Sequence, residues 1–242
     1  MKKGMKVEIW SDVVCPWCYI GKRRFEAALA EFENGDEVEI IWRSFQLDPQ
    51  APRNSELTVN ELLAGKYGMS IRQASAANAR VADIAAVEGL EYHLETAKYT
   101  NTFDAHRLIH LAARHGLQNE MKERLMRAYF TEGAAVGAAE TLVHLASEAG
   151  MDADEASGVL NSDKYADEVR ADERRARAFG ISGVPFFAID EKYGISGAQS
   201  SDVLRQALEQ AWAESHSLVK IGASTHAVTQ DNIECAGDSC AT

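Results

Sequence analysis

Proline is scarce in this 242-residue chain, and the few prolines are unevenly distributed. There are four prolines, and none lies between Arg53 and Val184. That stretch is rich in Ala, Leu, Glu, Arg and Lys, which favour helices, whereas an interior proline would break one. We therefore predict helices over residues 57–67, 71–88, 103–115, 120–131, 138–149 and 164–179. Glycine, which commonly ends helices, follows five of these ranges, at Gly68, Gly89, Gly116, Gly150 and Gly180.

Long apolar runs are also missing from the sequence. No segment approaches the roughly 20 apolar residues that a membrane-spanning helix needs. The first six residues are basic, as at the start of a secretion signal, but Glu8, Ser11 and Asp12 interrupt the apolar stretch that should follow. We therefore expect a cytoplasmic protein, in a compartment where thiols are kept reduced.

Positively charged residues are fewer than negatively charged ones. The chain has 25 Lys and Arg residues and 37 Asp and Glu residues, which gives a net charge of -12. Such a chain repels polyanions, so neither nucleic acid nor an anionic membrane is an expected partner. Cysteine is limited to four residues. In a reducing compartment, four cysteines indicate redox or metal chemistry more than structural disulfides.

Two of the cysteines form the motif Cys15-Pro16-Trp17-Cys18, which lies between an alternating apolar segment and an amphipathic one. Residues 7–14 are typical of a strand, and the apolar spacing over residues 25–32 predicts a helix. Proline suits the first position of that helix. Because unpaired N–H groups and the helix dipole stabilise a thiolate there, the sequence predicts a reactive dithiol.

The position of each cysteine suggests its role. Cys15, nearer the helix N-terminus and the surface, is expected to be the attacking thiolate, and Cys18, one turn further, to resolve the mixed disulfide. Lys22 and Arg23 are expected to add positive potential. The alternatives are a zinc half-site or an inert pair, which this strand and helix context disfavours.

Further strands frame the helical block. Residues 37–45, 184–189 and 193–196 are predicted strands, and residues 200–213 a final helix. Residues 6–50 and 181–215 should then complete one sheet domain, because neither half alone covers its sheet faces. Residues 53–180 are the expected inserted helical domain, and residues 216–242 a C-terminal extension with a second Cys pair. We expect Phe186, Phe187 or both in the core.

Four segments, in this order, resemble the DsbA-type oxidoreductases of the thioredoxin superfamily, and within them the FrnE-like subgroup. The segments are Ser11-Asp12-Val13-Val14-Cys15-Pro16-Trp17-Cys18, Phe45-Gln46-Leu47-Asp48-Pro49, Asn101-Thr102-Phe103-Asp104-Ala105-His106-Arg107 and Gly183-Val184-Pro185-Phe186-Phe187. The resemblance implies an α/β thioredoxin fold with a large inserted helical domain.

The resemblance also implies a peptide-binding site. In this superfamily the proline that matches Pro185 is cis and faces the dithiol, and the preceding residue, here Val184, offers backbone groups to a bound peptide. Pro16 and Trp17 are further expected substrate contacts, although Trp17 could equally cap the sheet edge. Many relatives carry a buried carboxylate six residues before the first cysteine. Here that position is Ile9, so the proton of the second cysteine would go to Glu8, Asp12 or water, or to no dedicated group.

A second cysteine pair, Cys235 and Cys240, lies beyond the resembling region, and Gly237-Asp238 between them favours a tight turn. The pair could exchange thiols with Cys15 and Cys18, form an incidental surface disulfide, or join the first pair in a zinc site.

His106 and His110 stand four residues apart on one predicted helix, a spacing that suits a metal. The metalloprotease motif would need a Glu after His106, where Arg107 stands, so we interpret both as ordinary polar positions and expect no metal.

We predict a cytoplasmic thiol-disulfide oxidoreductase, acting as reductase, oxidase or isomerase on protein or peptide disulfides. It would need no cofactor, and a thioredoxin or glutathione system would reduce it. One alternative is a kappa-like glutathione-dependent isomerase or transferase, although those enzymes generally have serine where Cys15 stands. The other alternative is a redox-sensing binding protein.

Overall fold

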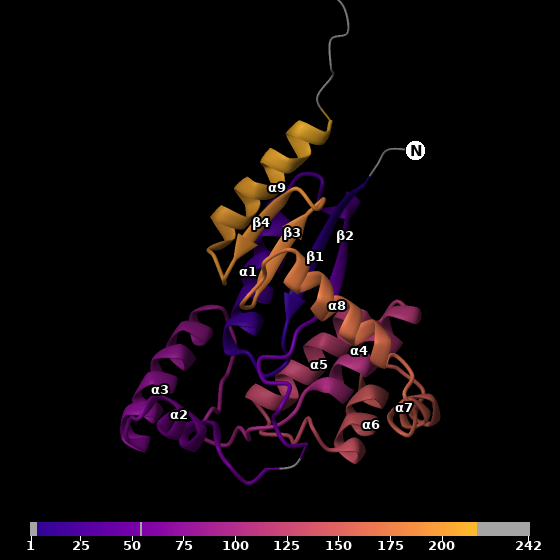
Figure 1. The fold of residues 1–242 in the computed structure, drawn as a ribbon. Helices are drawn as coiled ribbons and strands as arrows, with labels where there is room; N and C mark the ends of the chain where they lie inside the picture. The colour runs from indigo at the N-terminus through magenta and orange to yellow at the C-terminus, as the bar shows by residue number, and fades with distance from the viewer. Residues whose placement is uncertain (1–3, 54, 217–242) are drawn as a thin grey trace, which may run out of the picture.

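The computed structural model describes residues 4–53 and 55–216, and its centre is a four-stranded sheet (Figure 1). The strand order is β2 (Val38–Ser44), β1 (Met5–Ser11), β3 (Phe186–Ile189), β4 (Tyr193–Ser196). β1 and β2 are parallel, whereas β3 is antiparallel to both β1 and β4. The first and last parts of the chain therefore share one sheet, as the sequence predicts.

The alternation of side chains along β1 gives the sheet two covered faces. Val7 and Ile9 point into the main core with α1 (Pro16–Glu31) and α9 (Ser201–Ser215). Glu8 and Trp10 face α8 (Ala166–Ala178), where the Trp10 indole donates to the Asp172 carbonyl at 3.0 Å. Phe187 is fully buried, as expected for at least one of the two phenylalanines.

The chain between β2 and β3 is helical. Its elements before α8 are α2 (Val59–Tyr67), α3 (Ile71–Val87), α4 (Phe103–Arg114), α5 (Gln118–Phe130), α6 (Ala139–Glu148) and α7 (Ala153–Leu160). In Figure 1, α4 to α7 lie beneath one end of the sheet, with α2 and α3 beside them. A short 3-10 turn, η1 (Gly35–Glu37), precedes β2.

The predicted helices are confirmed, with ends shifted by at most a few residues. All five glycines expected after helices adopt positive φ, which glycine tolerates best. One helix was not predicted: α7 has eight residues, including Gly158, and its start depends on Asp152, whose carboxylate accepts from Glu155 N at 2.8 Å.

The predicted thioredoxin fold with helices inserted in it is confirmed. The exact limits of the inserted domain stay a prediction, and α8, which lies inside the predicted range, packs against β2. Across the two described ranges, no helix combines the length and the apolar character needed to cross a bilayer.

Candidate active site

The dithiol lies where β1 ends and α1 begins. Cys15 is the N-cap residue of α1, and Pro16 occupies the first turn, as the sequence predicts. The Cys15 N–H points back to the Asp12 carbonyl, and the Cys18 N–H donates to the Cys15 carbonyl at 3.0 Å. Both side chains are buried, with Cys15 4% and Cys18 1% exposed. Cys15 is thus the more accessible of the two residues, by a small margin.

A cis peptide bond joins Val184 and Pro185, as the resemblance implies. The Cys15 Sγ lies 3.6 Å from the Val184 carbonyl oxygen, to which the thiol donates. Pro185 also packs closely on α1, because a Cβ atom added to Gly21 would lie only 2.9 Å from the proline Cγ. The structure therefore brings residues 15 and 184 together from distant parts of the chain.

The two thiols ionise as a pair. The hydrogen bond to Cys18 and burial raise the pKa of Cys15 well above its usual range. Burial also opposes ionisation of Cys18, but the hydrogen bond from Cys15 and the charge of Lys122 lower the pKa of Cys18. The reduced pair thus favours its first negative charge on Cys18, and that charge has to shift to Cys15 before Cys15 can act as the nucleophile.

Lys22 and Arg23 were expected to add positive potential at the dithiol. The Lys22 ammonium instead lies 2.5 Å from Glu26 and 2.7 Å from Glu123. Arg23 binds the same two carboxylates. Their charges are therefore matched within α1 and α5, and Lys122 is the buried cation that acts on the thiols.

Asp12 organises the backbone beneath the dithiol. Its carboxylate is buried and accepts from Val13 N at 2.7 Å and from Leu47 N at 2.8 Å. His106 of α4 lies 3.3 Å from the same carboxylate. Although burial favours the protonated acid, the hydrogen bonds from His106 and Leu47 lower the pKa of Asp12. Asp12 therefore stays ionised and joins three of the four resembling segments.

The two histidines on α4 have separate partners. His106 meets Asp12, whereas His110 Nε2 lies 3.1 Å from both the Ser44 hydroxyl and the Asp172 carboxylate. Among the described residues, no group of three or more His, Cys, Asp or Glu side chains is placed to hold a metal.

A cavity of about 700 Å³ opens beside the first turn of α1. Val14 and Pro16 line it next to Cys15, and Leu47 and α2 line it further away. Its lining is mostly apolar, and no residue of α2 is fully buried. Trp17 is 40% exposed, so its ring is accessible from solvent.

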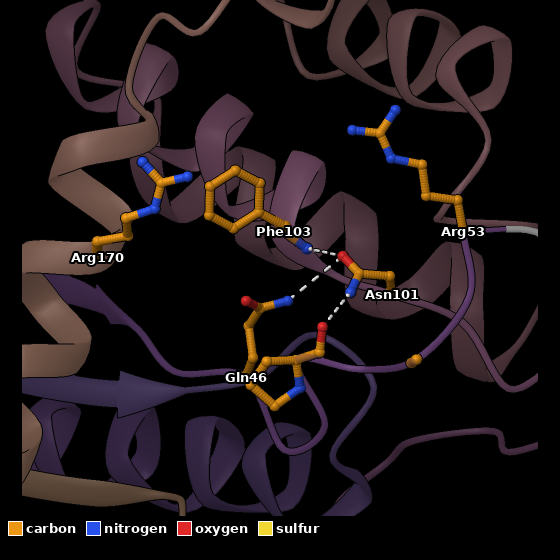
Figure 2. Close-up of a pocket in the computed structure, with 7 residues that line it drawn as sticks. Gln46, Arg53, Asn101, Phe103 and Arg170 are labelled. Carbon is orange, nitrogen blue, oxygen red and sulfur yellow. Dashed lines mark hydrogen bonds between the residues drawn. The ribbon is translucent and has the colours of Figure 1, made fainter.

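A second pocket, of about 340 Å³, lies between two of the resembling segments (Figure 2). Arg53 and Arg170 lie on opposite sides of Phe103, and the Arg170 guanidinium is 5.5 Å from that ring. The Asn101 amide accepts from Phe103 N at 2.9 Å and donates to the Pro49 carbonyl at 3.1 Å. These contacts explain the Asn101 segment as a structural link to the Pro49 loop.

Cys235 and Cys240 lie outside the described residues, so the alternatives for that pair stay predictions. The sequence analysis missed two residues of the site. Lys122 comes from α5, and Tyr92 donates its hydroxyl to the Pro16 carbonyl at 2.8 Å. Lys122 had a detectable signal, because Met126 and Tyr129 follow it at helical spacing and are buried.

Fold and site together define a thioredoxin-fold protein with a buried dithiol at a helix start and a cis proline facing it. The model of the DSBA-like thioredoxin domain matches residues 6–209. The chain belongs to this family, which places it among the DsbA-like thiol-disulfide oxidoreductases.

Individual relatives agree with this assignment. The crystal structure of a probable DsbA oxidoreductase from Streptomyces coelicolor is 47% identical, covers 91% of this chain and 94% of its own, and superposes with a TM-score of 0.85. The uncharacterized protein YwbO of Bacillus subtilis is 28% identical over 203 residues, 84% of this chain and 94% of YwbO.

A more distant likeness concerns the fold alone. The cytosolic disulfide reductase DsbM from Pseudomonas aeruginosa is 19% identical, with a TM-score of 0.60 over 86% of this chain and 98% of DsbM. Membership of the FrnE-like subgroup stays a prediction.

Proposed function

We propose that this protein reduces, forms or isomerises disulfides in protein substrates through a mixed disulfide at Cys15. The observation that carries the proposal is the contact between Cys15 Sγ and the Val184 carbonyl, 3.6 Å apart beside Pro185. A substrate sulfur that reaches Cys15 meets the backbone of Val184 at the same point. Substrate recognition and thiol exchange would then occur at one place.

The proposed reduction has two steps. Cys15, as a thiolate, attacks one sulfur of the substrate disulfide, so that a new S–S bond forms and the other substrate sulfur leaves with the electron pair. The Cys18 thiolate then attacks the Cys15 sulfur and releases the second substrate thiolate. The substrate gains two electrons and two protons, and Cys15 and Cys18 end as a disulfide. Oxidation of a substrate dithiol runs through the same steps in reverse.

We propose that polypeptide next to the substrate cysteine lies in the cavity beside Pro16. The cavity is mostly apolar and begins at the residues that flank Cys15. An extended or unfolded segment exposes apolar side chains that fit such a lining. The accessible ring of Trp17 adds an aromatic contact on the same helix turn.

The proposed setting is the cytoplasm, with a thioredoxin or glutathione system as electron donor. Neither the site nor the reaction requires a cofactor, because both electrons pass directly between a pair of thiols and a disulfide.

We further propose that Cys235 and Cys240 exchange electrons with the first dithiol. A redox titration of a Cys235→Ser, Cys240→Ser variant should then give a potential or rate at Cys15 that differs from wild type, and identical values would refute this exchange.

The proposed function is tested with single cysteine variants. Cys15→Ser should abolish insulin reduction and disulfide refolding activity, because the attacking sulfur is lost. Cys18→Ser should accumulate a mixed disulfide between Cys15 and a protein substrate that carries a disulfide, visible on non-reducing gels. Full activity of Cys15→Ser in both assays would overturn the proposal.

A further inference from the structure

Tyr92 joins the inserted helices to the turn that carries the dithiol. It lies in the loop between α3 and α4, and its hydroxyl donates to the Pro16 carbonyl at 2.8 Å. Pro16 is one of the two residues between the cysteines, so a side chain from a distant part of the chain binds the backbone of the motif itself. Tyr92 is only 8% exposed, so water competes little for this hydrogen bond.

Aromatic packing holds the Tyr92 hydroxyl in place. The Tyr92 ring stacks on Phe130 of α5, with ring centroids 4.6 Å apart, and on Tyr19 of α1, with centroids 6.1 Å apart. Phe130 and Tyr19 also stack on each other, at 6.0 Å. Tyr19 directly follows Cys18 in the sequence. Because turning the hydroxyl away from Pro16 would separate buried, stacked rings, packing fixes the hydrogen bond.

The peptide unit that Tyr92 binds lies at the start of α1. Cys15 is the N-cap and Pro16 the first helical residue, so the Trp17 N–H is one of the groups that have no partner inside the helix. Such N–H groups face the N-cap side chain. Over residues 4–53 and 55–216, the Cys15 thiol caps none of them and donates to the Val184 carbonyl instead. They are therefore available to the thiolate that forms when Cys15 loses its proton.

A hydrogen bond to the Pro16 carbonyl also acts on the Trp17 N–H, because both groups belong to one conjugated peptide unit. Donation to the oxygen polarises the unit and makes its N–H a stronger donor. The positive end of the Tyr92 O–H dipole points at the same turn, in a buried place where a dipole is little screened. Burial and the charge of Cys15 raise the pKa of the Tyr92 hydroxyl, so it stays a proton donor. Both effects stabilise negative charge on Cys15.

We propose that Tyr92 is a positioning residue of the dithiol: through the Pro16 carbonyl, it holds and polarises the Trp17 N–H that supports the Cys15 thiolate. The inference rests on the proposed function, in which this thiolate attacks the substrate disulfide. A thiolate exists only in the reduced protein. Tyr92 therefore stabilises the reduced form and makes the dithiol more oxidising.

Tyr129 provides a matched control. It is 3% exposed, its ring contacts Phe130 at a centroid distance of 4.9 Å, and its hydroxyl donates to the Lys98 carbonyl at 2.9 Å. Lys98 lies outside the dithiol motif. Tyr92→Phe and Tyr129→Phe each keep the ring and remove one buried hydroxyl with its bond to a backbone carbonyl. Both variants should therefore lose stability to a similar extent in urea unfolding.

The first experiment measures the equilibrium with glutathione in a Cys235→Ser, Cys240→Ser background, in which one dithiol reacts. Reduced protein and glutathione disulfide exchange to give the protein disulfide and two molecules of glutathione. Tyr92→Phe should shift this equilibrium towards the protein disulfide about threefold, because the reduced form loses the support of one hydrogen bond. Tyr129→Phe should stay within about 1.5-fold of its parent, because its hydrogen bond is the same in both redox states.

A second experiment follows the ionisation of Cys15 alone. With every other cysteine replaced by serine, ultraviolet absorbance against pH reports a single thiol. Tyr92→Phe should raise the pKa of Cys15 by about half a unit, which is the equivalent of a threefold change. Tyr129→Phe should leave this pKa in place.

Either an unchanged glutathione equilibrium or an unchanged Cys15 titration in folded Tyr92→Phe would overturn the proposal. Equal shifts in Tyr92→Phe and Tyr129→Phe would also overturn it, because they would trace the effect to lost stability. Neither measurement uses a protein substrate. A wild-type protein that is inactive on insulin, while Tyr92→Phe still shifts both readouts, would refute the proposed function and leave the role of Tyr92 standing.

Discussion

Gly21 of α1 and Pro185 are in such close contact that any side chain at position 21 would press on the proline ring. A Cβ atom there would lie 2.9 Å from Pro185 Cγ and 3.5 Å from its Cβ. The contact fixes the distance between α1, which carries Cys15, and the loop that carries Val184. Position 21 therefore controls the geometry of the site without reacting itself.

We expect Gly21→Ala to lower both stability and activity. The gain in helix propensity, about 1 kcal/mol, is smaller than the typical cost of overpacking, about 1–3 kcal/mol. The rate of insulin reduction should fall further than stability alone explains, because the Val184 carbonyl moves away from Cys15. Urea unfolding and the insulin assay check the two effects. Gly158→Ala, in α7 with no atom within 4 Å of the added Cβ, should instead gain about 0.5–1 kcal/mol. Equal effects of the two substitutions would contradict the argument.

Asp12 offers a second prediction, about stability. Asp12→Ala leaves the N–H groups of Val13 and Leu47 without their buried acceptor, and each such loss costs about 1–3 kcal/mol. We expect a total loss of about 3 kcal/mol in the free energy of unfolding. Asp12→Asn keeps one acceptor oxygen and should lose clearly less. Chemical denaturation of both variants measures the difference, and a milder effect of Asp12→Ala would rule out this role.

A third prediction concerns Asp172, which joins α8 to β2 and α4. Its carboxylate accepts from Ser44 N at 2.9 Å and lies 3.0 Å from Arg43 and 3.1 Å from His110. Asp172→Ala should destabilise the fold by about 3 kcal/mol, the usual cost of breaking a buried charged network. Asp167→Ala, on the exposed side of the same helix, should change stability by less than about 0.5 kcal/mol. Thermal unfolding of the two variants measures both losses of stability. Similar losses for Asp172→Ala and Asp167→Ala would show that the buried contacts at position 172 do not stabilise the fold.

Local pattern was enough to predict most of the fold. Apolar spacing and helix-ending glycines located the helices because both signals come from neighbours in sequence. α7 was not predicted because its eight residues, which include Ser157 and Gly158, show little apolar periodicity. Its buried side chains are covered by packing on α4 and α6. The Val184–Pro185 contact with Cys15 is long-range, and only the resemblance to a family predicted it.

The electrostatics of the site were harder to predict than its sulfur atoms. Lys122 stands between Met121 and Glu123 in a segment rich in charge, which masks the helical spacing from Lys122 to Met126 and Tyr129. It is buried only because α5 lies beneath the end of β1, where its ammonium meets the Ser11 carbonyl. The prediction that Lys22 and Arg23 add positive potential at the dithiol was wrong, because Glu123 of α5 forms ion pairs with both side chains.

Glu123 gives the last prediction, a pH dependence of stability. Burial opposes its ionisation, but hydrogen bonds from Arg23 and Lys22 lower its pKa to about 2, against an ordinary 4.5. Because the folded pKa is the lower one, the stabilisation is complete above pH 4.5 and disappears as the pH falls towards 2. Glu123→Gln should therefore be less stable than wild type at neutral pH, and the gap should close across that acid range. Urea unfolding at a series of pH values measures the gap. Glu120→Gln, the same chemical change at an exposed position of α5, should follow the wild-type curve. A gap for Glu123→Gln that is constant with pH would mean that the lost contribution is packing and not charge.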